Sequence, residues 1–386
     1  MSHCLEGISY FKDFDISLKE RFLRMNWTFY LLITLVVGIG IVLLYSASGG
    51  RMEPWAVRQC YRFLLACAFF FVIALSDLRL WMRYAYVLYF LSLVALLLVE
   101  FKGTVGMGAQ RWLDLGFFQF QPSELIKITL VLALARYFHG STENDIRKNT
   151  YLIIPALLMA VPVLLILKQP DLGTGLMLVM VTLSIFFLMG VQLWKFGVLI
   201  LMGIASIPVG WHFLHDYQKN RVLTFLNPES DPLGKGYHIM QSKITMGSGG
   251  VFGKGFLQGT QSHLNFIPEK HTDFIFTVLS EEFGMIGSCT LLILYMSIIF
   301  LGFRMALKSA NGFGKVVALG LTVNFATYVF INIAMVMGLL PVVGVPLPLV
   351  SYGGTAMLTL MIGFGFIECS YVNREMVIGR LGAFDG

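Results

Sequence analysis

Residues 27–46 read WTFYLLITLVVGIGIVLLYS, an apolar run of about 20 residues that decides the class of fold. Its length matches the thickness of a bilayer and exceeds the apolar core of a secretory signal peptide, so we expect an uncleaved first spanning helix. The composition agrees, because 57% of all residues are hydrophobic, 13% are charged and the mean hydropathy is +0.76. The five Cys residues are scattered and lack the spacing of a zinc site or a disulfide framework.

Further apolar runs of spanning length recur along the chain and predict about ten membrane helices. They lie near residues 27–47, 62–76, 84–101, 124–138, 151–167, 173–190, 195–214, 274–302, 315–338 and 353–372. The expected fold class is therefore an all-α polytopic membrane protein, formed as a single domain over residues 1–386. An even number of spans places both termini on the same side of the membrane.

The distribution of basic residues predicts which side this is. Short segments on the side of the termini carry many more Lys and Arg than the short loops opposite, which indicates that both termini are cytoplasmic. Residues 1–26 then form a cytoplasmic tail, and residues 215–273 form a large outer loop whose apolar side chains predict order. The net charge of +6 is explained by the same asymmetry, so we expect no nucleic-acid partner.

The end of the outer loop contains the most informative acidic residue. Residues 265–276 read NFIPEKHTDFIF, so Asp273 stands where a polar loop enters an apolar helix. Burial at such a boundary is costly for a carboxylate and raises a carboxyl pKa toward neutrality. From these residues alone, Asp273 is either a helix N-cap or a base for proton transfer. Glu281 and Glu282 follow deeper in the span and need partners if they are ionised there.

A second polar segment leads into the fourth span. It reads GAQRWLDLG at 108–116 and QPSELIK at 121–127. The spacing of Glu124 and Lys127 predicts an ion pair on one helical face, and a capped helix with such a pair is the simple interpretation. Alternatively, Arg111, Glu124 and Lys127 form a cation-rich patch able to hold a phosphate ester, since an unpaired ammonium in a membrane is costly.

Two other polar positions have open interpretations. In QPDLGTG at 169–175, Asp171 directly precedes a span, which favours a helix N-cap over a role in orienting a neighbouring cation. In the outer loop, Lys243 could contact an anionic substrate or simply solvate the loop. For this lysine the second interpretation is the stronger one.

The segment GLLPVVGVPLPLVSYGG at 338–354 interrupts the apolar carboxyl-terminal part of the chain. Pro341, Pro346 and Pro348 exclude a regular helix. Irregular backbone at membrane depth is tolerated only where it is buried in protein or lines a cavity. These prolines therefore predict either a groove for a lipid tail or a junction between helices.

Together these segments resemble the SEDS (shape, elongation, division and sporulation) family of bacterial membrane peptidoglycan polymerases. The matching stretches are GAQRWLDLG, QPSELIK, QPDLGTG, PEKHTDFIF and GLLPVVGVPLPLVSYGG, which lie between residues 108 and 354. Three stretches favour the elongation branch over the division branch: RWLDLG at 111–116, NPESDPLGKGYHIMQSKI at 227–244 and GSGGVFGKGFLQGTQS at 247–262.

The resemblance implies a glycosyltransferase that joins the disaccharide units of lipid II during cell elongation and so maintains rod shape. It implies that Asp273 is the essential carboxylate and that Arg111, Glu124 and Lys127 form a functionally important polar group. Lys243 and His271 are further candidates for substrate contacts. The implied partners are lipid II, membrane lipids, a class B penicillin-binding protein and the MreB/MreC/MreD complex, in a bacterial cell (inner) membrane.

The implied reaction transfers a glycan chain from undecaprenyl pyrophosphate to the 4-hydroxyl of N-acetylglucosamine in lipid II, with inversion. Such a displacement needs one base and a means of stabilising the leaving pyrophosphate. Asp273 is the candidate base, Arg111 and Lys127 are the candidate pyrophosphate contacts, and Glu124 would hold these cations. A divalent cation, Mg²⁺ or Mn²⁺, could assist the leaving group, with no ligand assigned. The alternative functions are a lipid II flippase or other transporter, and a non-catalytic scaffold for the penicillin-binding protein.

Overall fold

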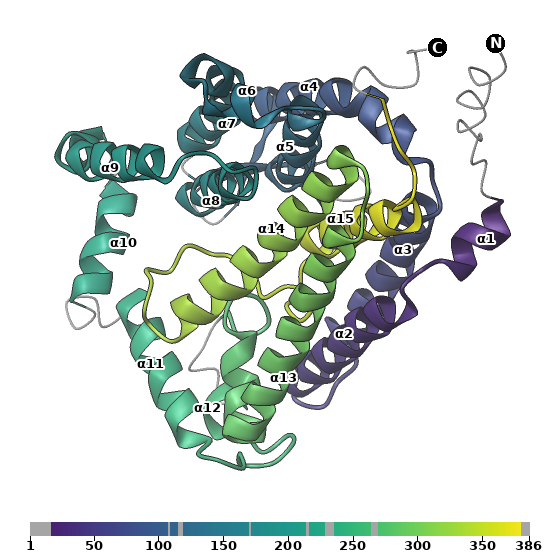
Figure 1. Ribbon diagram of the computed structural model, residues 1–386. Coiled ribbons are helices and arrows are strands. Elements are labelled where there is room, and N and C mark those ends of the chain that lie inside the picture. Colours follow the sequence, from purple (N-terminus) through teal and green to yellow (C-terminus); the bar gives the residue numbers. More distant parts are fainter. Residues whose placement is uncertain are drawn as a thin grey trace, which may run out of the picture.

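The computed structural model describes residues 17–106, 109–114, 119–169, 171–213, 216–227, 235–263 and 269–379. Ten long helices in these ranges form a bundle (Figure 1). They are α2 Trp27–Ala47, α3 Ala56–Ala74, α4 Leu78–Lys102, α5 Pro122–Phe138, α7 Asn149–Lys168, α8 Leu172–Leu188, α9 Leu193–Phe213, α13 Ile275–Leu307, α14 Gly312–Val336 and α15 Gly354–Val372. Each predicted span coincides with one of these helices, so the predicted helical membrane fold is confirmed.

Among the described residues, seven helices are long and apolar enough to cross a membrane: α2, α3, α4, α7, α13, α14 and α15. Helices α8 and α9 contain shorter apolar stretches. Helix α5 differs because it has 17 residues and carries Glu124 and Lys127 near its start. Nearly all of its side chains are buried by protein, which removes these charges from lipid.

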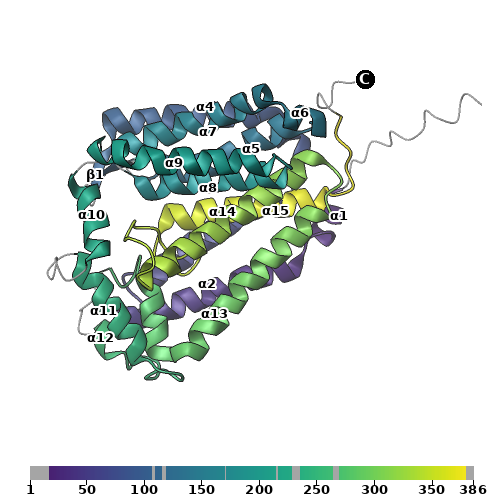
Figure 2. The same cartoon turned by 60° about the vertical axis from the view of Figure 1, so that its left-hand side comes forward.

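Helices α14 and α15 form the centre of the bundle (Figure 1), and each has 78% of its spanning window buried. Helix α14 packs against α5, α8, α13 and α15, and α15 packs along α3. In Figure 2, helices α4, α5, α7, α8 and α9 lie on one side of this central pair, and α2 and α13 lie on the other. Aromatic rings join the layers: Phe364 of α15 meets Phe29 of α2 and Phe325 of α14 edge-on, at 5.6 and 5.1 Å.

The two ends of the described chain meet at one end of the bundle. Helix α1 (Leu18–Leu23) precedes α2, and Arg24 pairs with Glu375 at 3.1 Å. This agrees with the even number of spans. The opposite end carries α10 (Asp216–Leu226), α11 (Lys235–Ser248) and α12 (Thr260–His263), as Figure 2 shows. The described parts of the 215–273 loop are therefore largely helical.

A small antiparallel sheet between α4 and α5 was not predicted. It has the strand order β1-β2-β3, with β1 at Thr104–Gly106, β2 at Ala109–Asp114 and β3 at Gln119–Phe120. The register pairs Val105 with Gln110 and Leu113 with Phe120. Strands of this length carry too little periodicity to be recognised in a sequence. The sheet adds a minor element to the all-α class and places the main chain of Arg111 near the start of α5.

Candidate active site

Asp273 lies in a turn just before α13. The N-cap residue of this helix is Phe274, which makes no side-chain cap hydrogen bond, so Asp273 lies one residue before the N-cap position that the sequence suggested for it. The turn is closed by a hydrogen bond from the N–H of Phe274 to the carbonyl of Glu269 at 3.2 Å. The Asp273 residue is half-buried. The residue is therefore partly accessible from outside the bundle, as a base acting on an external substrate requires.

The main chain of Asp273 is held by α14. The buried side-chain amide of Asn332 donates to the carbonyl of Asp273 at 2.9 Å and to the carbonyl of Val345 at 2.7 Å. Gly344, with φ +75°, lies against the carboxylate: a Cβ built there would be 3.6 Å from Asp273 Oδ2. One amide thus ties the candidate base to α14 and to the proline-containing segment.

The residues that precede the candidate base are held by the same segment. The hydroxyl of Ser351 donates to the carbonyl of Thr272 at 2.5 Å, and the N–H of Tyr352 donates to the carbonyl of His271 at 2.9 Å. From α3, the side chain of Gln59 donates to the carbonyl of Ser351 at 3.1 Å. The irregular backbone predicted at 338–354 is confirmed, and it supplies hydrogen bonds to the turn.

A stack of flat side chains continues from this turn. The ring of His271 lies 4.4 Å from the ring of Trp55, with 6° between their planes. Burial lowers the pKa of His271, and the charge of Glu269 acts in the opposite direction. The guanidinium of Arg62 lies 4.4 Å from the ring centre of Tyr352. Arg62 was not among the predicted site residues, yet it brings a cation to the network around the candidate base.

The three prolines of the irregular segment differ in their surroundings. Pro348 is buried, and its carbonyl accepts a hydrogen bond from the hydroxyl of Tyr295 at 2.7 Å. Pro341 and Pro346 are half-buried. A cavity of about 10 Å³ lies beside Pro346 and Pro348, which is the space of one water rather than of an acyl chain. The role of these prolines in a groove for a lipid tail therefore stays a prediction.

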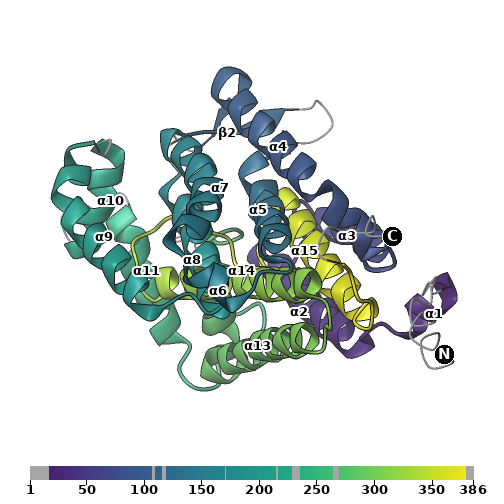
Figure 3. The same ribbon diagram turned by 45° about the horizontal axis from the view of Figure 1, so that its top comes forward.

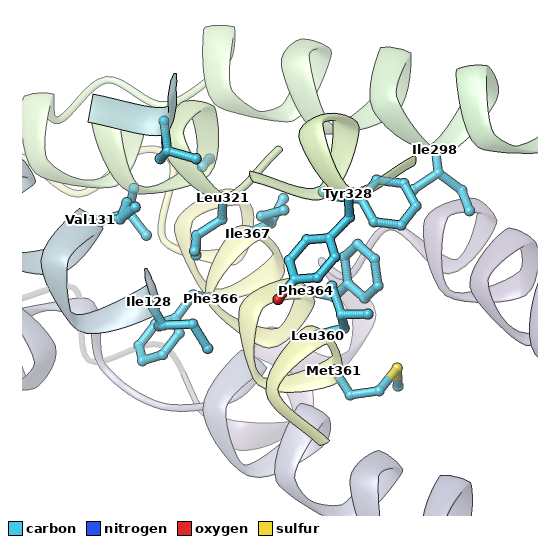
Figure 4. Close-up of a cluster of buried hydrophobic side chains, with 14 of the residues drawn as sticks. Ile128, Val131, Ile298, Leu321, Tyr328, Leu360, Met361, Phe364, Phe366 and Ile367 are labelled. Atoms are coloured by element: carbon cyan, nitrogen blue, oxygen red, sulfur yellow. The ribbon is translucent and has the colours of Figure 1, made fainter. Parts of the chain in front are cut away.

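The predicted ion pair on α5 is confirmed and is buried. The ammonium of Lys127 lies 2.7 Å from the carboxylate of Glu124, and their side chains are 2% and 8% exposed. The hydroxyl of Tyr328 bridges the two, since it donates to Glu124 and accepts from Lys127. Thr359 donates to the same carboxylate at 3.4 Å. Figure 4 shows the Tyr328 hydroxyl emerging among apolar side chains, which makes this a polar site in an apolar core.

Helix α14 connects this ion pair to the candidate base. Tyr328 and Asn332 are one helical turn apart on α14, and they contact Lys127 and Asp273 respectively. The structure thus brings together Asp273, His271, Glu124 and Lys127 around one end of α14. The side chain of Arg111 lies outside the described part of the structure, so its place in this group stays a prediction.

Two other predicted positions are resolved. Asp171 is the N-cap of α8, because its carboxylate accepts from the N–H and the hydroxyl of Thr174 at 3.2 and 2.9 Å. Lys243 is exposed on α11, and a Cβ built on Gly338 would lie 2.7 Å from its Nζ. Since Gly338 follows the end of α14, Lys243 lies at the same end of this helix as Asn332, which holds Asp273.

The glycine clusters of the outer loop interlock with a break in α13. Gly284 interrupts this helix with φ +62° and ψ −156°. Residues 250–255 fill the break with four main-chain hydrogen bonds of 3.0–3.2 Å, given as donor to acceptor: Lys254 to Glu281, Gly255 to Glu282, Met285 to Gly250 and Ile286 to Val251. A Cβ on Gly253 would lie 2.1 Å from the carbonyl oxygen of Glu282. Only glycine allows this close approach.

The acidic pair in α13 has the partners that the sequence analysis required. The buried carboxylate of Glu281 accepts from the ammonium of Lys254 and from the N–H of Gln261, both at 2.8 Å. The carboxylate of Glu282 accepts from the hydroxyl of Ser46 on α2. These contacts fasten the outer loop to the bundle close to the candidate base. In the described ranges, no group of three or more His, Cys, Asp or Glu is arranged to hold a metal ion, so no ligand can be assigned there.

Comparison with known proteins identifies the class to which this ten-helix membrane fold belongs. The family model described as "Cell cycle protein", which covers FtsW, RodA and SpoVE, matches residues 26–375. The chain therefore belongs to the SEDS family. It is 44% identical over 358 residues to the peptidoglycan glycosyltransferase MrdB of Escherichia coli K12, covering 92% of this chain and 95% of that protein. It is 35% identical over 346 residues to stage V sporulation protein E of Bacillus subtilis, covering 86% and 93%.

Solved structures agree with this assignment. The fold is similar to that of a chain from a peptidoglycan synthase complex that coordinates polymerization and crosslinking, with a TM-score of 0.78 and 32% identity over 91% of this chain and 98% of that one. It is also similar to the rod shape determining protein RodA of Thermus thermophilus, with a TM-score of 0.68 and 28% identity over 91% and 98%. The resemblance inferred from the sequence motifs is confirmed.

Proposed function

We propose that this protein is a peptidoglycan glycosyltransferase of the RodA type, which polymerises lipid II with Asp273 as the general base. The similarity to MrdB supports the activity. The observation that carries the role of Asp273 is its fixed main chain, held by Asn332, in a turn directly before the N-cap residue of α13. A base must be held at a fixed place relative to its substrate, and a rigid support of this kind provides it.

The chemistry is a single displacement. The carboxylate of Asp273 removes the proton from the 4-hydroxyl of the acceptor sugar as this oxygen attacks the anomeric carbon of the donor. The bond between that carbon and the pyrophosphate oxygen breaks, and its electron pair leaves with undecaprenyl pyrophosphate. One glycosidic bond forms with inversion, and one proton is carried away by the base. The retaining mechanism of hydrolases, with a second carboxylate as nucleophile, is not needed.

The leaving pyrophosphate needs positive charge. Arg111 and Lys127 are the candidates from the sequence, and Arg62 beside Tyr352 is added by the structure. Because Lys127 is enclosed with Glu124, it would have to leave this carboxylate before it could contact a phosphate. The arginines are therefore the stronger candidates. Lys127 and Glu124 then keep α5 and α14 in register beneath the site.

The surroundings of the proposed reaction follow from charge and similarity. The asymmetry of basic residues supports cytoplasmic termini, with the 215–273 loop on the outer face of a bacterial cell membrane. The similarity to a chain of a peptidoglycan synthase complex supports assembly with a crosslinking partner, a class B penicillin-binding protein. Assembly with this partner and with the MreB/MreC/MreD complex is part of what we propose.

The decisive experiment uses purified protein and purified lipid II, with the product length read on a gel. We expect polymer from the wild type and from Asp145→Asn, a control that changes a partly exposed acid on α6 at the other end of the bundle. We expect no polymer from Asp273→Asn, with unchanged yield and unfolding temperature. Polymer made by Asp273→Asn at the wild-type rate would contradict its role as base.

A second arm of this experiment separates the alternative functions. The assay is run with and without a class B penicillin-binding protein. Polymer formed without any partner excludes a scaffold. A flippase or other transporter would instead move lipid II between leaflets of a vesicle and would leave the gel empty with or without the partner.

A further inference from the structure

A pocket of about 510 Å³ lies at the end of the bundle that carries the termini. The Asp273 turn lies at the opposite end, where α13 begins. The pocket is formed by the start of α4, the end of α5 and the start of α7. Figure 3 shows α5 and α7 side by side, with α6 (Glu143–Arg147) next to them. Its wall includes Tyr86, Arg136, Tyr137 and Tyr151. Neither the ion pair on α5 nor the Asp273 turn uses these residues.

Arg136 gives this pocket its chemistry. Its Cζ lies 4.8 Å from the ring centre of Tyr86, and its Nη1 donates to the carbonyl of Met82 at 2.6 Å. In the part of the chain that the structure describes, no Asp or Glu pairs with Arg136. Its hydrogen bonds use Nη1, which leaves Nε and Nη2 as donors in the fork that matches a phosphate group.

Hydroxyl groups complete a polar wall. Those of Ser141 and Tyr151 lie 2.5 Å apart, and the hydroxyl of Tyr137 donates to the carbonyl of Tyr151 at 2.8 Å. Arg83 and Arg147 add positive charge on the adjoining segments, whereas Lys148 is paired with Asp145 at 3.8 Å. A guanidinium with hydroxyls at a basic membrane boundary selects an anionic group with several acceptor oxygens.

The helices that form the pocket indicate where this anion comes from. Deeper along α4 and α7, large apolar side chains are exposed, including Phe90 (63%), Ile154 (51%) and Leu157 (56%). Exposed apolar surface on membrane helices is covered by acyl chains. We propose that the pocket binds the phosphate head group of an anionic phospholipid, whose chains lie along α4 and α7. This inference is independent of the polymerase activity, since it concerns binding alone.

The test is a titration of the purified full-length protein in detergent, followed by native mass spectrometry. The probes are dioleoyl phosphatidylglycerol, dioleoyl phosphatidylcholine and inorganic phosphate. We expect saturable binding of phosphatidylglycerol, weaker binding of phosphatidylcholine, and no displacement of the lipid by an equal concentration of phosphate. Arg136→Gln should weaken the binding of phosphatidylglycerol on the order of tenfold, because it removes a charge-assisted contact.

Two further variants keep the test decisive. Arg304→Gln removes an exposed arginine from the same end of the bundle, at the end of α13, and should leave the affinity unchanged. Ser141→Glu brings a carboxylate to the pocket while Arg136 is intact, and should weaken binding as Arg136→Gln does. Matching elution profiles and unfolding temperatures establish that the variants are folded. Unchanged binding by Arg136→Gln and Ser141→Glu, an equal loss in Arg304→Gln, equal affinity for both lipids, or displacement by phosphate would each overturn the proposal.

Discussion

Asn332 positions the charged residue Asp273 through a hydrogen bond to its main chain. It holds the carbonyl of Asp273, so its effect on the carboxylate passes through the main chain. It also holds Val345, which keeps the irregular segment against the same turn. Such a residue has no catalytic chemistry of its own, but its loss allows the base to move.

Asn332→Leu keeps the volume of this side chain and leaves two buried carbonyls without their donor. We expect a loss of about 2 kcal/mol in the free energy of unfolding. We also expect a fall of about tenfold or more in kcat for lipid II polymerisation with little change in KM, because a displaced base acts on chemistry rather than on binding. Initial rates over a range of lipid II concentrations measure both. Thr327→Val on the same helix is the control, since among the described residues its hydroxyl donates to the carbonyl of Val323 in its own helix. A wild-type kcat in Asn332→Leu would contradict the positioning role.

The buried pair Glu124–Lys127 predicts strongly non-additive stability changes. Lys127→Met leaves a carboxylate in the core without its ammonium and should cost about 3–5 kcal/mol of unfolding free energy. Adding Glu124→Gln removes the stranded charge, so the double variant should be more stable than Lys127→Met alone. Thermal unfolding of the wild type, both single variants and the double variant completes the cycle. Losses that simply add would show that the two groups act separately.

His271 makes part of the stability depend on pH. Its pKa is lowered by burial in the folded protein, whereas an unfolded His gains a proton near pH 6.5. The unfolded state therefore binds more protons as the pH falls through about 6.5, and the stability contribution of neutral His271 is lost in that direction. His271→Phe keeps a ring beside Trp55 and cannot titrate. We expect its unfolding temperature to fall less between about pH 7.5 and pH 5.5 than that of the wild type. Equal falls would contradict this account.

At the scale of elements, the junction between the outer loop and α13 depends on Gly253. A methyl group there would overlap the carbonyl of Glu282, and φ is +79°. Gly253→Ala should cost at least about 2 kcal/mol and increase hydrogen exchange of the amides in 250–255. Gly247→Ala is the matched control in α11, since a Cβ there meets open space, and it should be neutral or slightly stabilising. Similar exchange in both variants would show that the interlock does not depend on the glycine.

The elements themselves were largely predictable, and the reason is physical. A bilayer demands an apolar run of about 20 residues with every main-chain group paired internally, so each long helix leaves a clear signal in the sequence. The strands β1, β2 and β3 leave no such signal. Pairing between short segments depends on how the flanking helices α4 and α5 are placed. The break at Gly284 was also not predicted. A single glycine inside an apolar run does not indicate that the helix is interrupted or that another loop packs into it.

The candidate site was predictable only in part for a related reason. Asp273, Glu124 and Lys127 could be named because charges are rare at membrane depth. Asn332 is 59 positions from its partner Asp273, and Gln59 is 292 positions from its partner Ser351. Polar residues of this kind gain their role from distant segments that the fold brings together. A single sequence contains no record of such contacts.

At the scale of the whole molecule, the proposed orientation is directly testable. A green fluorescent protein fused to the carboxyl end should fluoresce, because that end is proposed to be cytoplasmic. A membrane-impermeant thiol reagent applied from outside should label Lys219→Cys in α10 and should not label Lys148→Cys at the other end. The unsubstituted protein gives the background from its native cysteines. Labelling of Lys148→Cys instead of Lys219→Cys would reverse the topology.

The break in α13 at Gly284 has a mechanical consequence. It divides α13 into a short outer section that follows directly from the Asp273 turn and a long inner section that belongs to the bundle. Residues 250–255 are bonded to both sides of the division, so a displacement of this loop must be shared between the sections. The outer section is then a rigid lever about two turns long, with the candidate base at its far end. A protein that binds the outer loop could therefore shift the proposed base, Asp273, without approaching the substrate.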